Sequence, residues 1–272
     1  MLNKILNKLN KILLSSPWYD YIDNEIIINT TLKIFEEDKK DYSKSKIIYR
    51  LCGQSGAGKT SQLLPAIKKS LLLNHRKAKV IAVRDFAKYH PNYKELLKLY
   101  SKHQIREKTN SFALKCLFLT LCLFIKNGYE IICDVTLLSV EFEKLLNSIL
   151  KEFNYTQKFN IIAINKKISD KNILKRQNDT HNFEFGRIIN KDSAEYFYKN
   201  LNKSIKYLSK NEKETAIIWT SFYLSPVYYG SINNCYKKFK KFRKIKSSNI
   251  YTEKDLLNSK IKVYYNLIKK FW

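Results

Sequence analysis

The stretch that decides the fold is residues 50–67, which read RLCGQSGAGKTSQLLPAI. Within it, GQSGAGKT at residues 53–60 matches the phosphate-loop pattern G-x-x-x-x-G-K-[ST] at every position. An apolar, β-branched run at residues 47–52 precedes the loop, and a helical pattern follows it. Because strand, loop and helix occur in the order that phosphate binding requires, the stretch predicts a nucleotide-binding site.

The residue types in the loop indicate a role for each position. The three glycines let the backbone curl so that successive N–H groups face one anion. Lys59 is expected to reach the β- and γ-phosphates, and the Thr60 hydroxyl is expected to ligate Mg²⁺. The expected cofactors are therefore ATP or GTP and Mg²⁺. The predicted nucleotide-binding residues are Gly53, Gln54, Ser55, Gly56, Ala57, Gly58, Lys59, Thr60 and Ser61.

Apolar runs alternate with helical patterns along the rest of the chain. This alternation predicts an α/β fold, a P-loop NTPase-like parallel sheet of about five strands flanked by helices. Functional residues should then follow the carboxyl ends of the strands. The strands are expected at residues 47–52, 79–83, 129–135, 159–165 and 215–221, and the helices near Thr60, Tyr93, Lys108, Val140, Asp170 and Asp192.

Three segments are expected: a helical N-terminal segment at residues 1–46, a phosphate-loop domain at 47–224, and a basic helical appendage at 225–272 that is not an independent domain. Residues 1–14 place apolar side chains at helical spacing, which suits a membrane-surface helix, a partner-binding helix or a helix packed on the domain. Residues 233–249 carry a basic run interleaved with Tyr and Phe, which suits nucleic-acid binding or a solvated helix face.

The composition is strongly basic. The chain has 51 Lys and Arg against 24 Asp and Glu, which gives a net charge of +27. Such an excess favours anionic partners, such as nucleic acid, nucleotide sugars, acidic proteins or anionic lipid. Lys, Asn and Ile are also abundant throughout the sequence, as an AT-rich genome would produce. The charge therefore leaves nucleic-acid binding open without favouring it.

Cysteine usage and hydropathy bear on the compartment. The five cysteines contain no C-x-x-C pair, which predicts buried thiols in a reducing compartment. A cytoplasmic protein is the expectation, with secretion as an effector left open.

The longest apolar run, residues 112–125, is interrupted by Lys115 and is too short to span a bilayer, so no transmembrane segment is expected.

Candidate catalytic residues follow the predicted strands and helices. The Asp85 carboxylate could accept the proton of a substrate hydroxyl, or it could be a helix cap or surface residue. Asp134 and Thr136 could bind substrate hydroxyls or a Mg²⁺-bound water, or could form a structural turn. Arg176 and Arg187 flank a polar stretch that could close as a lid and neutralise a transferring phosphoryl group, or they could be solvated charges.

In order and spacing, these motifs resemble the zeta toxin family over residues 47–208. That family comprises kinases of toxin–antitoxin systems that phosphorylate the sugar 3′-hydroxyl of UDP-N-acetylglucosamine. The resemblance implies a nucleotide-sugar acceptor and an antitoxin or other protein partner. It is carried by GQSGAGKTS at residues 53–61, FAKYHPNYKELLKLY at 86–100, NGYEIICDVT at 127–136, and the segment with Arg176 and Arg187.

The resemblance also implies residue roles. Asp85 would be the general base, and Lys59 and Thr60 would hold the phosphates and Mg²⁺. Arg176 and Arg187 would be the lid arginines. The substrate contacts would be Phe86, His90, Asp134 and Thr136.

Two departures concern the acceptor side. The family typically has Asp, any residue and Phe before its His-Pro pair. An alignment without a gap puts Arg84 in the aspartate position. A shift of one residue in the alignment puts Asp85 there instead. The family's E-G-T-x-R reads D-V-T-L-L at residues 134–138, so Leu138 replaces the usual substrate-binding arginine. We therefore expect an intact phosphoryl-donor half and an altered acceptor half.

Three function classes remain open from the sequence. The first is a small-molecule kinase of the zeta toxin type. The second is a nucleoside or polynucleotide kinase, which the charge would suit and which predicts salt-sensitive nucleic-acid binding. The third is a nucleotide-binding protein that transfers no phosphate and acts through a partner, an idea that Arg84 and Leu138 motivate. A hydrolytic motor is disfavoured, because no hydrophobic run ends in D-E and no second nucleotide module occurs.

Overall fold

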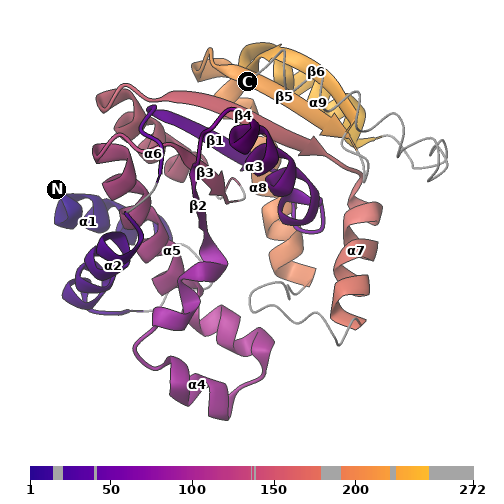
Figure 1. The fold of residues 1–272 in the computed structure, drawn as a ribbon. Helices are drawn as coiled ribbons and strands as arrows, with labels where there is room; N and C mark the ends of the chain where they lie inside the picture. Colours follow the sequence, from indigo (N-terminus) through magenta and orange to yellow (C-terminus); the bar gives the residue numbers. More distant parts are fainter. Residues whose placement is uncertain are drawn as a thin grey trace.

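A six-stranded sheet with the order β2-β3-β1-β4-β5-β6 forms the centre of the fold (Figure 1). The first five strands run parallel, and β6 runs antiparallel to β5, so the predicted α/β fold is confirmed. The strands are β1 (Ile47–Cys52), β2 (Lys79–Ala82), β3 (Ile131–Asp134), β4 (Thr156–Ala163), β5 (Thr215–Thr220) and β6 (Ser225–Ser231). The computed structural model describes residues 1–14, 21–39, 42–135, 137, 139–178, 191–220 and 225–244.

Strand β6 is a sixth strand that the alternating pattern of the sequence does not predict. It contains Pro226 and Gly230, residue types that weaken a strand interior. The strand lies at the edge of the sheet, where proline is tolerated because one side needs no ladder hydrogen bonds. Residues 225–244, predicted as part of an appendage, therefore extend the sheet and core of the phosphate-loop strands.

Helices cover both faces of the sheet (Figure 1). Alternation along β3 sends Ile131 and Cys133 to one face and Ile132 to the other. Helix α3 packs with Ile132, whereas α5 and α6 pack on the opposite face, which α8 and α9 continue over β4 and β5. The helices are α1 (Leu2–Leu13), α2 (Asn24–Asp38), α3 (Leu64–Leu73), α4 (Tyr93–Leu99), α5 (Lys102–Lys126), α6 (Val140–Glu152), α7 (Lys166–Asn178), α8 (Lys191–Asn211) and α9 (Cys235–Arg243).

Two helices begin earlier than the sequence pattern predicts. Helix α5 begins at Lys102, because Ser101 and Gln104 form a capping box that starts the helix before its apolar stripe. Helix α7 begins at Lys166, where the Asn165 side chain accepts a hydrogen bond from a backbone N–H of the first turn. Capping by polar residues, rather than hydrophobic periodicity, sets both starts.

The apolar face of helix α1 is covered. Leu6 and Leu9 are fully buried and belong to the same hydrophobic cluster as α2 and α5. Of the three interpretations of this segment, a helix packed on the domain is the one that the structure supports, because the face that a membrane or partner would need is inside.

Helix α5 is the longest of the described helices, with 25 residues. By length and composition alone, Gln104–Lys126 could cross a membrane, although no transmembrane segment is expected from the apolar run at residues 112–125. However, 89% of its apolar window is buried inside the protein, and α5 packs against α1, α2 and α6. Its hydropathy is that of a helix at the centre of a hydrophobic core.

The five cysteines are free thiols, and all are buried, as predicted. Burial raises the pKa of the Cys133 thiol to about 11 and that of Cys116 to about 12. Thiols with such pKa values are poor nucleophiles at neutral pH. The cysteines therefore act as core residues.

Candidate functional site

The phosphate loop joins β1 to a short π-helix, η1 (Lys59–Leu63), which continues into α3. Gly56 and Gly58 have φ values of +78° and +91°, which only glycine adopts at little cost. A Cβ at Gly56 would also lie 2.4 Å from the carbonyl oxygen of Ser169 in α7. The loop conformation thus depends on these glycines and on close contact with α7.

The side chain of Lys59 lies against the start of its own loop. Its Nζ donates hydrogen bonds to the carbonyl oxygens of Gly53, at 2.6 Å, and Gln54, at 3.3 Å. The ammonium group therefore lies among the loop residues predicted to surround the phosphates. All nine predicted nucleotide-binding residues, 53–61, lie in this loop and the first turn after it.

Thr60, Arg84 and Asp134 come together where three neighbouring strands end. The Thr60 hydroxyl donates a hydrogen bond to Asp134 Oδ2 at 2.7 Å. Arg84 Nη1 donates to the same carboxylate oxygen and to Thr60 Oγ1, each at 3.2 Å. The strand order brings these residues together, because β3 lies between β1 and β2. Arg84, which the predicted site did not include, is thus part of it.

The oxygens of Thr60 and Asp134 suit a magnesium ion. Mg²⁺ prefers hydroxyl, carboxylate and phosphate oxygens, and in P-loop proteins a loop Ser/Thr and a strand-end Asp hold it. No group of three or more His, Cys, Asp or Glu that could hold a metal occurs in the described part of the chain. A magnesium ion here would therefore take its remaining ligands from the nucleotide and water.

Asp85, the predicted general base, lies in the short turn η2 (Val83–Asp85) that follows β2. Its side chain is 53% exposed, and a carboxylate oxygen lies 3.7 Å from Arg84 Nε. Partial burial raises the pKa of Asp85 above its ordinary value, and the Arg84 guanidinium offsets part of that rise. Arg84 rather than Asp85 makes the described contacts with Thr60 and Asp134, so the base role of Asp85 stays a prediction.

Phe86 and His90 support the turn after β2. Phe86 is almost fully buried in the core that contains α5. His90 is also buried: its Nδ1 accepts a hydrogen bond from the Asn92 N–H, and its ring meets Phe112 edge-on at 5.3 Å between centroids. Both side chains pack inward in this structure, and their predicted substrate contacts stay predictions.

Part of the predicted site lies outside the described residues. Thr136, Leu138 and Arg187 fall outside them. Arg176 lies in α7, but its side chain is not among those described. The lid and acceptor roles assigned to these residues therefore stay predictions.

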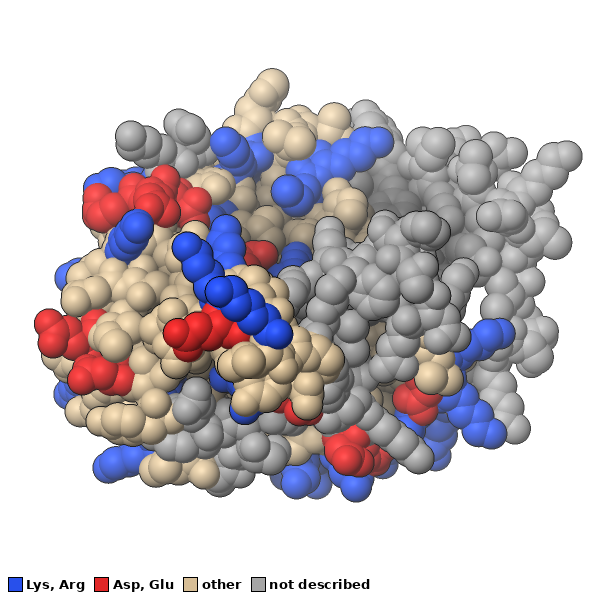
Figure 2. Space-filling model, turned by 90° about the horizontal axis from the view of Figure 1, so that it is seen from below, with Lys and Arg blue, Asp and Glu red and all other residues tan. Residues whose placement is uncertain are grey.

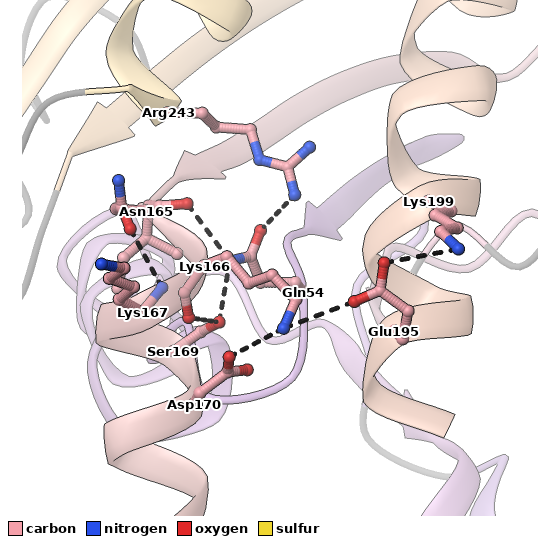
Figure 3. A network of polar contacts seen from close by, with 10 residues as sticks. Gln54, Asn165, Lys166, Lys167, Ser169, Asp170, Glu195, Lys199 and Arg243 are labelled. Atoms are coloured by element: carbon pink, nitrogen blue, oxygen red, sulfur yellow. Dashed lines mark hydrogen bonds and ion pairs between the residues drawn. The ribbon is translucent and has the colours of Figure 1, made fainter. Parts of the chain in front are cut away.

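The second residue of the loop, Gln54, is held by a network that Figure 3 shows. Gln54 Nε2 donates to Ser169 Oγ at 2.9 Å and to the Ile164 carbonyl at 3.1 Å. Gln54 Oε1 accepts from Arg243 Nη2 at 2.8 Å, and Arg243 Nη1 donates to Asn202 Oδ1 at 2.6 Å. The far end of α9 thereby contacts the phosphate loop directly.

Arg243 is an exception within its basic run: the described lysines of the run, at positions 237, 238, 240, 241 and 244, are exposed, as a solvated helix face would be, whereas Arg243 is buried. The residue is 5% exposed, and its guanidinium stacks on the Tyr198 ring at 3.6 Å, so it is neither solvated nor available to nucleic acid. Burial lowers the pKa of Arg243 to about 10, which leaves it charged at neutral pH. Cys235, Phe239 and Arg243 share the buried face of α9 at a spacing of four residues, a pattern visible in the sequence but obscured by the surrounding lysines.

Replacing Arg243 with Met is expected to lower the free energy of unfolding by about 1–3 kcal/mol, because the buried acceptor on Gln54 and the partly buried acceptor on Asn202 lose their donor. Urea unfolding measures this change. The matched control is Lys241→Met, an exposed cation on the same helix, which should change the free energy by less than about 0.5 kcal/mol. Equal effects of the two substitutions would contradict the anchoring role.

Comparisons with known proteins bear on this site. Residues 32–221 match the sequence profile described as Zeta toxin. Toxin PezT of Streptococcus pneumoniae serotype 4 is 30% identical over 152 residues, which are 55% of this chain and 58% of that protein. The chain therefore matches less than two thirds of that relative's length.

Two solved structures share the fold. A structure from the characterization of the PezAT chromosomal toxin–antitoxin system of Streptococcus pneumoniae covers 92% of this chain and 99% of its own, with a TM-score of 0.68 and 24% identity. The match to a structure of AvrRxo1-ORF1:AvrRxo1-ORF2 with sulphate ions covers 98% of this chain and 85% of the matched chain, with a TM-score of 0.50 and 11% identity. At these identities the likeness supports the fold alone.

The family profile spans well over half of the chain and includes the loop, Arg84, Asp85 and Asp134. The resemblance seen in the sequence motifs is therefore confirmed. The chain belongs to the zeta toxin family, whose members are kinases.

Proposed function

We propose that this chain is a kinase that transfers the γ-phosphate of ATP or GTP to a hydroxyl group of a small molecule, UDP-N-acetylglucosamine or a related nucleotide sugar. The observation that carries the proposal is the contact between Thr60 and Asp134 at 2.7 Å, directly beside Lys59 of the phosphate loop. This arrangement of lysine, hydroxyl and strand-end carboxylate suits a nucleotide phosphate with its cation.

In the proposed mechanism, the backbone N–H groups of residues 53–61 hold the nucleotide phosphates. Lys59 turns from the loop carbonyls to the β- and γ-phosphates. Thr60 and Asp134 carry the oxygens that would suit Mg²⁺, and the Arg84 guanidinium lies 3.2 Å from both of them, so positive charge at this position, from the ion or from Arg84, would neutralise the phosphate oxygens. The positively charged lid arginines, Arg176 and Arg187, would stabilise the transferring group.

Asp85 would take the proton of the acceptor hydroxyl. Its half-exposed carboxylate is open to an acceptor molecule, and its raised pKa makes it a stronger base than an ordinary aspartate. Arg84, 3.7 Å away, would keep the carboxylate oriented.

Asp85→Asn is expected to lower the transfer rate by about 10²- to 10⁴-fold, because general-base catalysis is lost. Nucleotide affinity should change by less than about threefold, since Asp85 acts on the acceptor. In the wild type, the transfer rate should rise with pH as Asp85 loses its proton. The midpoint of this rise should lie above the ordinary aspartate pKa of about 3.9, because the pKa of Asp85 is raised in the folded protein. Steady-state kinetics across pH, with nucleotide affinity measured by calorimetry, test both statements.

The control for this substitution is Glu95→Gln, which removes an exposed carboxylate on the neighbouring helix α4. The control variant should keep the wild-type rate. Full activity in Asp85→Asn would show that the base is another group and that the alignment of this segment with the family must be redrawn.

A second candidate function is nucleotide binding without transfer, in which the protein acts through a partner. The observation that favours it is that Arg84, not Asp85, contacts Thr60 and Asp134. Nucleotide affinity without phosphate transfer to any acceptor would support this second function.

A protein partner is part of the proposal. The structural relative from Streptococcus pneumoniae belongs to a toxin–antitoxin system, so we infer an antitoxin as the partner class. On the face that Figure 2 shows, the described Lys and Arg side chains are interspersed with Asp and Glu, so no continuous basic patch is seen on the described part of that face.

A further inference from the structure

The guanidinium of Arg84 lies where a cation would contact both Thr60 and Asp134. Its Nη1 is 3.2 Å from Thr60 Oγ1 and 3.2 Å from Asp134 Oδ2, the two oxygens that suit a magnesium ion. The Asp134 side chain is 2% exposed, so its charge needs a partner within the protein. The Arg84 side chain, at 25% exposure, supplies that charge.

Strand register builds this contact into the fold. Ala82, the last residue of β2, pairs with Asp134, the last residue of β3. The turn η2 begins at the next residue, so the chain brings Arg84 next to Asp134 without a long or adjustable loop. Thr60 lies just after the loop that follows β1, the other neighbour of β3. The contact therefore joins the ends of β2 and β3 to the first turn after the phosphate loop.

We propose that Arg84 is the resident cation of the nucleotide site, so that ATP binds this chain with little dependence on a divalent ion. The inference rests on the proposed function, because it assumes that the loop binds nucleotide phosphates. A permanent positive charge beside Thr60 attracts the phosphates and repels a divalent cation that would use the same two oxygens. Arg84 thus acts on nucleotide binding directly and sets the ion requirement of the site.

Calorimetric titration of ATP in buffers with MgCl₂ or with EDTA tests this inference. In the wild type, the two dissociation constants should agree within about threefold. Arg84→Gln removes the charge, so ATP affinity in EDTA should fall to at least about tenfold below its affinity in MgCl₂. The control is Lys88→Gln, an equal loss of charge at an exposed residue just beyond η2, which should behave as the wild type.

Thermal unfolding with Mg²⁺ alone gives a readout that needs no nucleotide. Mg²⁺ should raise the midpoint of Arg84→Gln, whose oxygens are free to bind the ion, and should leave the wild type unchanged. If Arg84→Gln does not fold, the wild-type comparison in MgCl₂ and EDTA decides the question.

The outcomes separate this inference from the proposed function. Wild-type ATP affinity that falls tenfold or more in EDTA, with the same fall in Arg84→Gln, would overturn the role of Arg84 and leave the kinase proposal intact. Absence of ATP binding by the wild type in both buffers would overturn the nucleotide site itself and the inference with it.

Discussion

Lys59→Ala is expected to lower the rate of phosphate transfer by about 10²- to 10³-fold, because it removes the positive group that would stabilise the transferring phosphoryl. In the structure, Lys59 Nζ lies 2.6 Å from the Gly53 carbonyl, inside the loop that would surround the phosphates. Its loss leaves the loop glycines unchanged, so the fold should persist. Single-turnover transfer from labelled ATP measures the rate.

The matched control is Lys69→Ala, which removes an exposed lysine from α3, the helix that continues from the loop. This variant should transfer phosphate at the wild-type rate. A Lys59→Ala rate within tenfold of the wild type would show that the loop does not hold the reacting phosphates in the way proposed here.

Glu143→Leu is expected to lower the free energy of unfolding by about 3–5 kcal/mol, because it removes one partner of a buried ion pair. Glu143 in α6 pairs with Arg50 at 2.8 Å in the centre of β1, and the side chains are 0% and 3% exposed. Removal of the carboxylate leaves the guanidinium buried with Gln157 as a hydrogen-bond partner and without a counter-charge. Chemical denaturation measures the change.

Two further variants separate the buried charge from other effects. Glu141→Gln, on the exposed side of the same helix, should change the free energy by less than about 0.5 kcal/mol. Replacing the pair together, Arg50→Met with Glu143→Leu, should recover most of the loss, because a well-packed apolar pair needs no counter-charge. A double variant as unstable as Glu143→Leu would contradict this explanation.

The start of the sheet could be predicted from local sequence. Strand β1 has the predicted bounds because a β-branched run leads directly into the glycine-rich loop. The same run could not reveal that Arg50 is buried, since its partner Glu143 is distant in the sequence and meets it only when α6 packs on the sheet. Local patterns thus identify the strand and the loop, but not the charged pair beneath them.

The remaining site residues depend on register and distant packing. Arg84 looked like a departure from the family pattern; its contact with Thr60 and Asp134 follows from the pairing of β2 with β3, which a sequence does not display. Arg243 lay in a run of lysines, and its contact with Gln54 requires α9 to cross back over the sheet. Strand β6 was missed because its proline and glycine resemble a turn.

The most direct test of the central claim is transfer of label from γ-labelled ATP and GTP to UDP-N-acetylglucosamine, beside other nucleotide sugars and an RNA oligomer, with Lys59→Ala as the control. The account predicts label on a nucleotide sugar with the wild type and its loss in Lys59→Ala. ATP binding without label on any acceptor would contradict the kinase proposal and leave nucleotide binding as the function.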